Sequence, residues 1–221
     1  MFVDDKAIEF FSSRMLLVKI NAGEDTLIKK EYNVSGFPTN ILMDARGNEI
    51  DRMMGFAPTD EYLKTMIDYA SGVGTLDDLL NRAKGDVDRA LYFEIAEKYK
   101  YRGGLEEAGQ WYEKVIEAGD ALDSLSGRSR LGWADMYRRA KDYDRSLAAF
   151  QAVLDDFPNG SVDQEAMIYK AYILKVQGNN DKALAVLEDF VKTYPESEDV
   201  EWAQEQIDKL KAEPADDAGD K

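Results

Sequence analysis

The side chains of this chain that could do chemistry are carboxylates, amines, guanidinium groups, hydroxyls and aromatic rings. Its 221 residues include no Cys and no His. Without cysteine there is no disulfide, no thiolate nucleophile and no zinc–thiolate site. Without histidine the usual general base and the commonest transition-metal ligand are missing. We therefore expect no enzyme activity, no catalytic residue and no cofactor in the sequence as it stands.

Paired carboxylates are the next candidates, because clustered acids can bind a cation. Asp77-Asp78, Asp155-Asp156 and Asp216-Asp217 all lack the alternating spacing with a central glycine that a calcium loop needs. Arg102-Gly103-Gly104 is a glycine-containing turn with no preceding strand and no following Lys-Ser/Thr, so it is not a phosphate loop. We expect solvated helix ends and a turn between helices, and no metal site.

The charge of the chain limits its partners. Its 44 acids and 28 bases give a formal net charge of −16, which repels nucleic acid and anionic lipid. The longest apolar runs have the length of strands, so no membrane insertion is expected. The first residues, MFVDDKAIEFF, carry acids where a signal peptide has bases, and the compartment stays open. A protein or peptide is the favoured partner.

The first 72 residues alternate between short apolar runs and amphipathic stretches. This pattern predicts the order helix, strand, helix, strand, strand, helix. The helices are expected at Asp4–Ser12, with Ile8 and Phe11 on one face, at Glu24–Tyr32, and at Thr59–Tyr69, with Thr59 as N-cap. The strands are expected at Met15–Ile20, which should be buried, at Thr39–Asp44, and at Glu49–Met54 after a turn over residues 45–48.

One segment in this region carries a family resemblance. Lys30-Glu31-Tyr32-Asn33-Val34-Ser35-Gly36-Phe37-Pro38-Thr39 resembles the thioredoxin segment that leads into the strand with the cis-proline. Phe2-Val3-Asp4-Asp5 is similar to a run that follows the active-site helix in one thioredoxin-like branch. The resemblance implies that Pro38 is cis and that Phe37, Pro38 and Thr39 shape a peptide-binding groove. The alternative is that Pro38 only ends a loop before a strand.

The departure from that family concerns the core of the fold. The sequence begins downstream of the family's central core strand and of its Cys-x-x-Cys motif. In the family the central core strand lies between the two strands that match residues 15–20 and 39–44. Loss of the central strand would leave these two strands unpaired. We expect a truncated thioredoxin-like domain over residues 1–73, with Met1 an internal methionine or the start of a trimmed chain. The alternative is a degenerate fold that closes the gap differently.

From Thr75 onward the apolar residues recur with helical periodicity. Thr75 with Asp78 forms a variant of the capping box. The clearest helical hairpin that follows resembles a 34-residue tetratricopeptide unit, in which small residues let two helices approach and aromatics fill the space beside them. Its matching residues are Trp133, Ala134, Tyr137, Tyr143, Ser146, Phe150, Val153 and Pro158.

Two further hairpins repeat this pattern on either side. The first carries Tyr92, Ile95, Ala96, Tyr99, Gly103, Leu105, Ala108, Tyr112 and Val115. The third carries Ala171, Gly178, Ala183, Leu187, Phe190 and Pro195. A capping helix over Glu198–Lys211, with Ser197 as N-cap, should complete a helical array over residues 74–212, followed by a disordered acidic tail over 213–221.

The tetratricopeptide resemblance implies a second candidate site. Such arrays bind extended peptides along the first helix of each unit, and basic and aromatic residues stand at those positions here. An acidic or C-terminal peptide would suit the arginines; the alternative is that they only solvate helices and form pairs along them. The residues are Phe93, Lys100, Tyr101, Arg128, Arg138, Arg139, Tyr172 and Lys175, with Glu97, Leu131, Asp135, Ile168 and Tyr169 at the remaining positions.

The sequence as a whole predicts two parts, an incomplete thioredoxin-like α/β domain and an all-α tetratricopeptide solenoid. The favoured function is a redox-inactive scaffold for protein–protein interaction. The alternatives are a truncated thiol–disulfide oxidoreductase, whose dithiol lies upstream of Met1 and whose repeats recruit substrate, and a purely structural redox-dead subunit. A dithiol motif and a signal peptide upstream would favour the oxidoreductase and a place in the bacterial periplasm.

Overall fold

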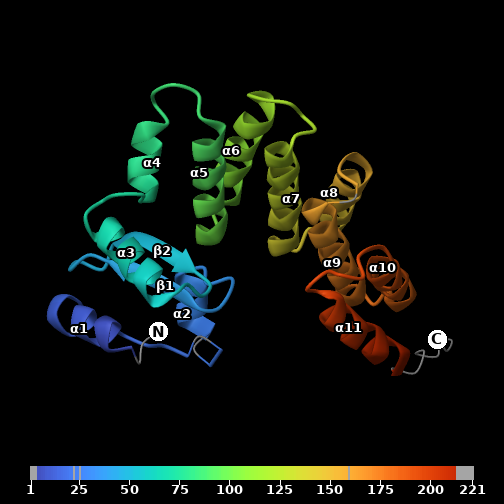
Figure 1. Cartoon of the computed structure of the whole chain (residues 1–221), viewed down its shortest axis with the longest axis horizontal. Helices are drawn as coiled ribbons and strands as arrows, with labels where there is room; N and C mark the ends of the chain where they lie inside the picture. Colours follow the sequence, from blue (N-terminus) through green and yellow to red (C-terminus); the bar gives the residue numbers. More distant parts are fainter. Residues whose placement is uncertain (1–3, 22, 25, 159, 213–221) are drawn as a thin grey trace. The chain divides into compact units, whose positions relative to one another are not determined.

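The computed structural model describes residues 4–21, 23–24, 26–158 and 160–212, which form eleven helices and one two-stranded sheet (Figure 1). The chain divides into two compact units, Met1–Trp111 and Tyr112–Lys221, and each is described by itself. Unit one contains α1 (Asp5–Arg14), α2 (Thr26–Glu31), β1 (Thr39–Met43), β2 (Glu49–Met54), α3 (Thr59–Ala70), α4 (Leu76–Arg82) and α5 (Arg89–Arg102). Helix α6 (Leu105–Glu117) spans the division, and unit two contains α7 (Ser124–Arg139), α8 (Tyr143–Asp156), α9 (Ser161–Val176), α10 (Asn180–Thr193) and α11 (Val200–Ala212).

The two strands of unit one form an antiparallel hairpin, as the sequence predicts. Thr39 pairs with Met54 and Leu42 with Asp51, and a bulge between Leu42 and Met43 precedes the turn. Asp44 closes that turn by accepting hydrogen bonds from the amide nitrogen and the side chain of Asn48. Helix α3 packs on the sheet through a small core that it shares with α1.

The N-terminal helices differ in detail from their predictions. Helix α1 begins after Asp4, whose carboxylate accepts from the Lys6 amide, and it buries Ala7 and Phe11 while Ile8 is 48% exposed. Residues 2 and 3 of the Phe2-Val3 resemblance lie outside the described residues. Helix α2 is shorter than expected. Pro58, and not Thr59, is the N-cap of α3, without a side-chain hydrogen bond.

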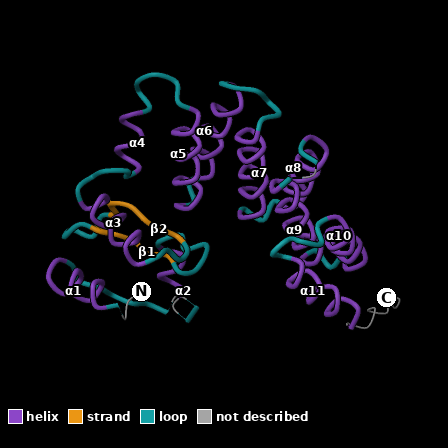
Figure 2. Tube along the Cα trace, viewed as in Figure 1, coloured by secondary structure: helices purple, strands orange, loops and turns teal. Residues whose placement is uncertain are grey.

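The predicted buried strand at Met15–Ile20 is wrong. These residues form neither helix nor strand in the structure, and they run as a loop between α1 and α2 (Figure 2). Met15 packs against the core of α1 and α3. Leu16, Leu17, Val18 and Ile20 are exposed, Leu16 to 91%. Within the described residues β1 pairs with β2 alone, and this apolar run pairs with neither strand.

The junction after α3 is built on a buried carboxylate. Thr75 accepts from the Asp78 amide and caps α4 as predicted, while Asp78 accepts from the Gly74 amide. Asp51 in β2 is fully buried and accepts from the Leu76 amide at 2.7 Å. It also pairs with Lys98 and Arg102 of α5 at 3.0 and 2.7 Å. The β-hairpin and the first repeat helix therefore belong to one compact unit, whereas the sequence places a domain boundary at residue 74.

Unit two contains the clearest helical hairpin, α7 with α8. Ala134 and Ser146 are both fully buried where the helices cross, and the Ser146 hydroxyl donates to the Ala134 carbonyl at 2.8 Å. Phe150 and Val153 fill the space beside them. Gly132 lies against Tyr112 of α6, so closely that a Cβ there would be 2.5 Å from the Tyr112 ring. These contacts explain why the repeat requires small residues at such positions.

Helices α9 and α10 form the next hairpin, and α11 closes its apolar face. Ala183, Leu187 and Phe190 of α10 pack with Ala203, Ile207 and Leu210 of α11. The capping helix starts at Val200, two residues later than predicted. Ser197 accepts from the Asp199 amide before the helix begins, so it is not the N-cap. The predicted acidic tail over 213–221 lies outside the described residues.

Candidate functional site

Arg138 is the centre of the candidate site in unit two. Its guanidinium lies over two aromatic rings of α9, with the carbon atom Cζ 5.0 Å from the Tyr169 centroid and 5.7 Å from the Tyr172 centroid. Helices α7 and α9 are neighbours, so a residue on one reaches the other. A cation held against tyrosine faces is stabilised by the ring quadrupoles. The structure thus brings together Arg138 and Tyr172, which the sequence predicted for one face.

Asp135 anchors this arginine from the preceding helical turn. Its two carboxylate oxygens accept from Arg138 Nε and from Arg139 Nε, each at 2.7 Å. Asp135 is buried, and the side chains of both arginines are largely covered. The two arginines share this carboxylate, and Glu165 adds a second negative charge near the Tyr169 ring. The arginines therefore pair along their helix, and peptide binding by them stays a prediction.

Burial also affects the ring under Arg138. The pKa of Tyr169 is raised above its ordinary value, first by burial of the phenol and then by the negative charges of Asp135 and Glu165. Arg138 and Arg139 act in the opposite direction. Tyr169 also stacks on Phe150, with ring centroids 5.5 Å apart. Tyr169 is therefore a fixed, neutral platform between the core and the arginine.

The surface continues from α9 to α11. Lys175, one helical turn beyond Tyr172, donates to the side-chain oxygen of Gln206 at 3.1 Å. Tyr172 is 45% exposed, and Val176 and Trp202 are exposed as well. Because residues three and four apart share a helix face, Trp202 lies on the Gln206 face of α11 and Tyr172 on the Lys175 face of α9. We call Arg138, Tyr169, Tyr172, Lys175 and Gln206 the α7–α9–α11 surface.

One predicted residue of unit two lies away from this surface. Arg128 is exposed and precedes Arg138 by ten residues on α7, which corresponds to about 15 Å along a helix axis. The sequence, on the other hand, gave no role to Gln206, because α11 was interpreted only as a solvating cap. The signal available was its spacing of three and four residues from the buried Ala203 and Leu210, which places Gln206 beside the buried stripe of α11.

The first-hairpin residues lie in unit one. Lys100 is buried, donates to both carboxylate oxygens of Glu97 at 2.7 and 2.8 Å, and lies over the Tyr101 ring at 4.8 Å. The Tyr101 carbonyl accepts from Arg52 of β2 at 3.0 Å. Phe93 is half-buried on the same helix. Lys100 is thus already neutralised by Glu97, and a binding role for these residues stays a prediction.

The proline segment has the expected backbone. The Phe37–Pro38 peptide bond is cis, which confirms that part of the prediction. Phe37 is exposed, with Lys29 Nζ 5.4 Å from its ring centroid. The Thr39 hydroxyl donates to the Gly36 carbonyl at 2.7 Å. Peptide binding by Phe37, Pro38 and Thr39 stays a prediction.

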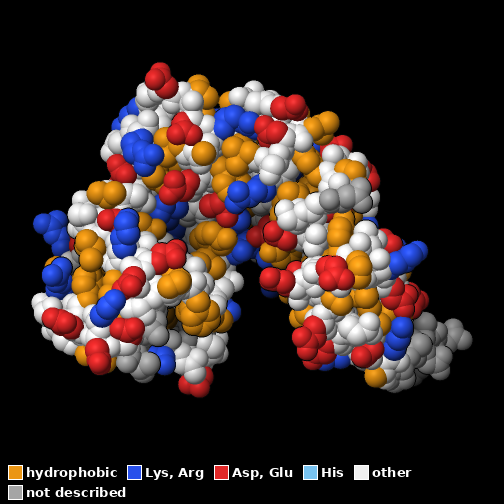
Figure 3. Space-filling view, viewed as in Figure 1, with side chains coloured by type: hydrophobic (Ala, Val, Ile, Leu, Met, Phe, Trp, Pro, Cys, Tyr) orange, Lys and Arg blue, Asp and Glu red, His pale blue; other side chains and the backbone are white. Residues whose placement is uncertain are grey.

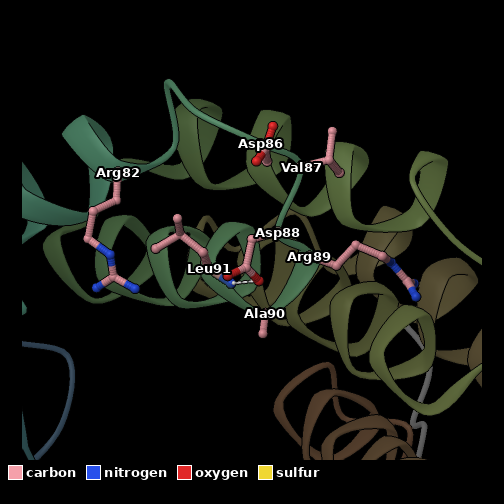
Figure 4. Close-up of a pocket in the computed structure, with 7 residues that line it drawn as sticks. All are labelled: Arg82, Asp86, Val87, Asp88, Arg89, Ala90 and Leu91. Atoms are coloured by element: carbon pink, nitrogen blue, oxygen red, sulfur yellow. Dashed lines mark hydrogen bonds between the residues drawn. The ribbon is translucent and has the colours of Figure 1, made fainter.

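A shallow hollow lies between the end of α4 and the start of α5 (Figure 4). Asp88 caps α5 there by accepting from the Leu91 amide. Arg82 and Arg89 point in different directions, so no set of polar groups converges on one ligand position. The described residues also contain no group of three or more acidic side chains able to hold a metal ion. The hollow therefore carries no assigned chemistry.

Comparison with known proteins matches one part of the chain. The family described as "YfiO: Outer membrane lipoprotein" matches residues 134–204, from the middle of α7 to the start of α11. No curated protein matches the chain. The family match and the successive helical hairpins together establish a tetratricopeptide-type helical repeat. None of the helices in the described part of the chain has the length and apolar character needed to cross a bilayer.

Proposed function

We propose that this protein is a scaffold that holds another protein through its helical repeats. The observation that carries the proposal is the α7–α9–α11 surface, where three helices of unit two contribute a cation, exposed aromatic area and an amide. The match to the family of outer membrane lipoproteins supports a protein partner for this region. Exposed aromatics beside a fixed arginine are the residue types that contribute most to protein interfaces.

The ligand proposed for this surface is an extended peptide with acidic side chains or a C-terminal carboxylate. Arg138 and Arg139 flank Asp135, and Lys175 adds a further cation one turn beyond Tyr172. Each exposed ion pair contributes only about 0.2–1 kcal/mol, so packing on Tyr172 and Trp202 must contribute most of the affinity. Selectivity for an acidic peptide would come from the arginines and Lys175 acting together.

The test is a fluorescence titration of the full chain with a library of acidic and carboxyl-terminal peptides. Tyr172→Ala and Lys175→Glu should each weaken a bound peptide by about tenfold, which corresponds to about 1.4 kcal/mol. Arg138→Glu is less suitable, because it would place a second acid beside the buried Asp135. The matched control is Arg145→Glu on α8, whose side chain is 72% exposed. If Arg145→Glu weakened peptide binding as much as Lys175→Glu, only the net charge of the protein would matter. That result would contradict binding at the α7–α9–α11 surface.

We further propose that residues 1–73 are a thioredoxin-like region without redox activity. The helix α2, the hairpin β1–β2 and the helix α3 follow in the order that the resemblance implies. Because the chain contains no cysteine, it has no thiol to exchange. An insulin-reduction assay with dithiothreitol should proceed at the rate of the protein-free control. Clear acceleration by the protein would contradict this proposal.

We also propose a location in the bacterial envelope, because the matching family is described as an outer membrane lipoprotein. This proposal is compatible with the periplasm, which the sequence left open for a chain with an upstream signal peptide. Fractionation of cells that express the native gene from its own start would test it. Recovery of the protein with cytosolic markers would contradict it.

A further inference from the structure

Lys175 on α9 is a partly buried cation whose only partner is a neutral group. Among the described residues it forms no ion pair, and its one hydrogen bond goes to the side-chain oxygen of Gln206 at 3.1 Å. The nitrogen of the same Gln206 amide donates to no acceptor in the described part of the chain. A carboxylate at this position would accept hydrogen bonds from both side chains, the ammonium group and the amide.

Unit two contains a second lysine–glutamine pair, and in that pair the carboxylate is present. Lys170 Nζ donates to the side-chain oxygen of Gln151 at 2.6 Å, and the nitrogen of that amide donates to Asp155 at 2.8 Å. Lys175 and Gln206 make the same lysine-to-amide contact without an acid beside it. The group that would complete the pair of Lys175 and Gln206 is therefore a carboxylate.

The acids next to Gln206 on α11 have other partners. Glu205 pairs with Lys209 of its own helix at 2.8 Å, and Asp208 accepts from the Gln204 amide at 3.0 Å. Figure 3 shows acidic side chains spread over unit two, so this part of the molecule is not short of acids. The carboxylate for the pair must therefore come from outside the described helices.

The segment that follows α11 carries acids within reach of this pair. Its sequence, EPADDAGDK over residues 213–221, includes Asp216 and Asp217. Gln206 precedes Ala212, the last residue of α11, by six residues, which corresponds to about 9 Å along the helix axis. The four and five residues from Ala212 to the two aspartates extend over up to about 13–17 Å. Either carboxylate can therefore reach back to the level of Gln206.

We propose that residues 213–217 fold back along α11 and place an aspartate carboxylate at the pair of Lys175 and Gln206, as an internal competitor for the acidic peptide. The regulatory consequence rests on the proposed function, because an occupied pair cannot bind the carboxylate of a peptide. Pro214 favours the return of the chain, since proline lacks the amide that a continuing helix needs. The competitor belongs to the same chain, so it acts at every protein concentration.

The competition should be partial. A short flexible connection gives the competing segment an effective concentration of about 1 mM. A few exposed charge pairs and an aromatic contact give a peptide a dissociation constant of about 0.1–1 mM. The ratio of the two concentrations then predicts that the segment weakens peptide binding by about two- to tenfold. Added salt should reduce this difference, because it screens exposed charge pairs.

The test is fluorescence anisotropy of the full chain with a labelled peptide that has the sequence of residues 213–221 and blocked ends. Asp216→Asn/Asp217→Asn should bind this probe about two- to tenfold more tightly than the wild type, since its own segment no longer competes. The control is Asp181→Asn/Asp189→Asn, which removes the same charge from exposed positions of α10. The control should bind the probe as the wild type does. An equal gain in both variants would show an effect of net charge alone and would overturn the proposal.

Nuclear magnetic resonance of the Gln206 side-chain amide tests the internal contact without any added peptide. Its proton signals should differ between the wild type and Asp216→Asn/Asp217→Asn, whereas those of Gln151, which has its own carboxylate, should not. Unchanged Gln206 signals would overturn the proposal, even if acidic peptides bind the protein. So would a difference that grows with protein concentration, because it would show binding between copies.

The two proposals fail in different ways. If the Gln206 signals differ as expected but neither the probe nor any acidic peptide binds any form of the protein, the contact within the chain is supported and the scaffold function at this surface is contradicted. If acidic peptides bind and the wild type and Asp216→Asn/Asp217→Asn bind the probe equally well, the scaffold function is supported and the internal competitor is overturned.

Discussion

Asp51 in β2 and Arg102 in α5 form an ion pair of 2.7 Å across 51 residues of sequence. Asp51 is fully buried, and Lys98 and the Leu76 amide donate to its other carboxylate oxygen. Arg102 also contacts Glu49 of the same strand at 3.2 Å. The pair joins the β-hairpin to the first repeat helix, so the α/β part and the start of the repeat array share one buried polar network.

Removing the carboxylate from this network should destabilise the protein strongly. Asp51→Asn removes the negative charge and one of the two acceptor oxygens that the largely buried Lys98 and Arg102 share. Breaking a buried ion pair by removal of one partner costs about 3–5 kcal/mol. We expect the free energy of unfolding of unit one, measured by urea denaturation and circular dichroism, to fall by that amount.

The control for this variant is Asp60→Asn, which removes an acid from the same unit. Asp60 pairs with Lys6 at 2.8 Å, but the two side chains are 81% and 68% exposed. Such surface pairs contribute about 0–1 kcal/mol. Equal effects of Asp51→Asn and Asp60→Asn would show that the buried network contributes nothing specific to stability.

The same network affects how the chain can be divided. A fragment of residues 104–212 retains α6 and all the helices α7–α11 of unit two, so it should be strongly helical and unfold cooperatively. A fragment of residues 74–212 adds α4 and α5 but removes Asp51. Its added helices should unfold at lower urea concentration than α7–α11. Circular dichroism of both fragments checks this; a single transition at one midpoint for residues 74–212 would contradict it.

The elements that the sequence predicted correctly are those whose signal is local. Phe150 and Ala134 belong to apolar patterns with helical spacing, which can be recognised in the sequence without knowledge of the tertiary structure. The β1–β2 hairpin is likewise marked by its turn residues. Residues 15–20 have the same apolar character as a buried strand. A strand exists only where another strand pairs with it, and no local pattern reveals whether that neighbour is present.

The candidate site shows a similar limit. The tetratricopeptide resemblance implied that Arg138, Tyr172 and Lys175 would share a face, and the structure brings Arg138 over Tyr172. Spacing along α7 could also suggest the pairs of Asp135 with Arg138 and Arg139. It could not show that Asp135 is buried, because burial depends on how α9 packs against α7. The spacing also could not predict the hydrogen bond from Lys175 to Gln206, because that bond depends on where α11 packs.

Close packing at Gly132 predicts a large effect of a small change. An added Cβ would be 2.5 Å from the ring carbon Cζ and the hydroxyl of Tyr112, a fully buried side chain. Overpacking of this kind costs about 1–3 kcal/mol. Alanine gains about 1 kcal/mol over glycine in a helix, which offsets part of that cost. We expect Gly132→Ala to lower the free energy of unfolding of unit two, measured by urea denaturation.

The comparison for this variant is Gly160→Ala, since nothing lies within 4 Å of a Cβ placed there. Gly160 is the N-cap of α9, where replacement of glycine by alanine has a modest effect. Gly160→Ala should therefore be the milder variant. A Gly132→Ala protein at least as stable as the wild type would show that Tyr112 moves aside, and that α6 and α7 are not tightly packed.

The raised pKa of Tyr169 predicts a loss of stability at alkaline pH. In the unfolded chain this phenol ionises near its ordinary pKa of 10.0, whereas in the folded chain burial, Asp135 and Glu165 oppose ionisation. Near and above pH 10 the phenol is therefore protonated more often in the folded state than in the unfolded state. The free energy of unfolding falls as pH rises in this range. Below about pH 9 neither state is ionised and the phenol contributes no pH dependence. Urea unfolding of wild type and Tyr169→Phe between about pH 8 and pH 11 measures this, because the variant lacks the ionising group. We expect the wild type to lose stability relative to Tyr169→Phe above about pH 10, and a difference that stays constant over the whole range would contradict the assignment.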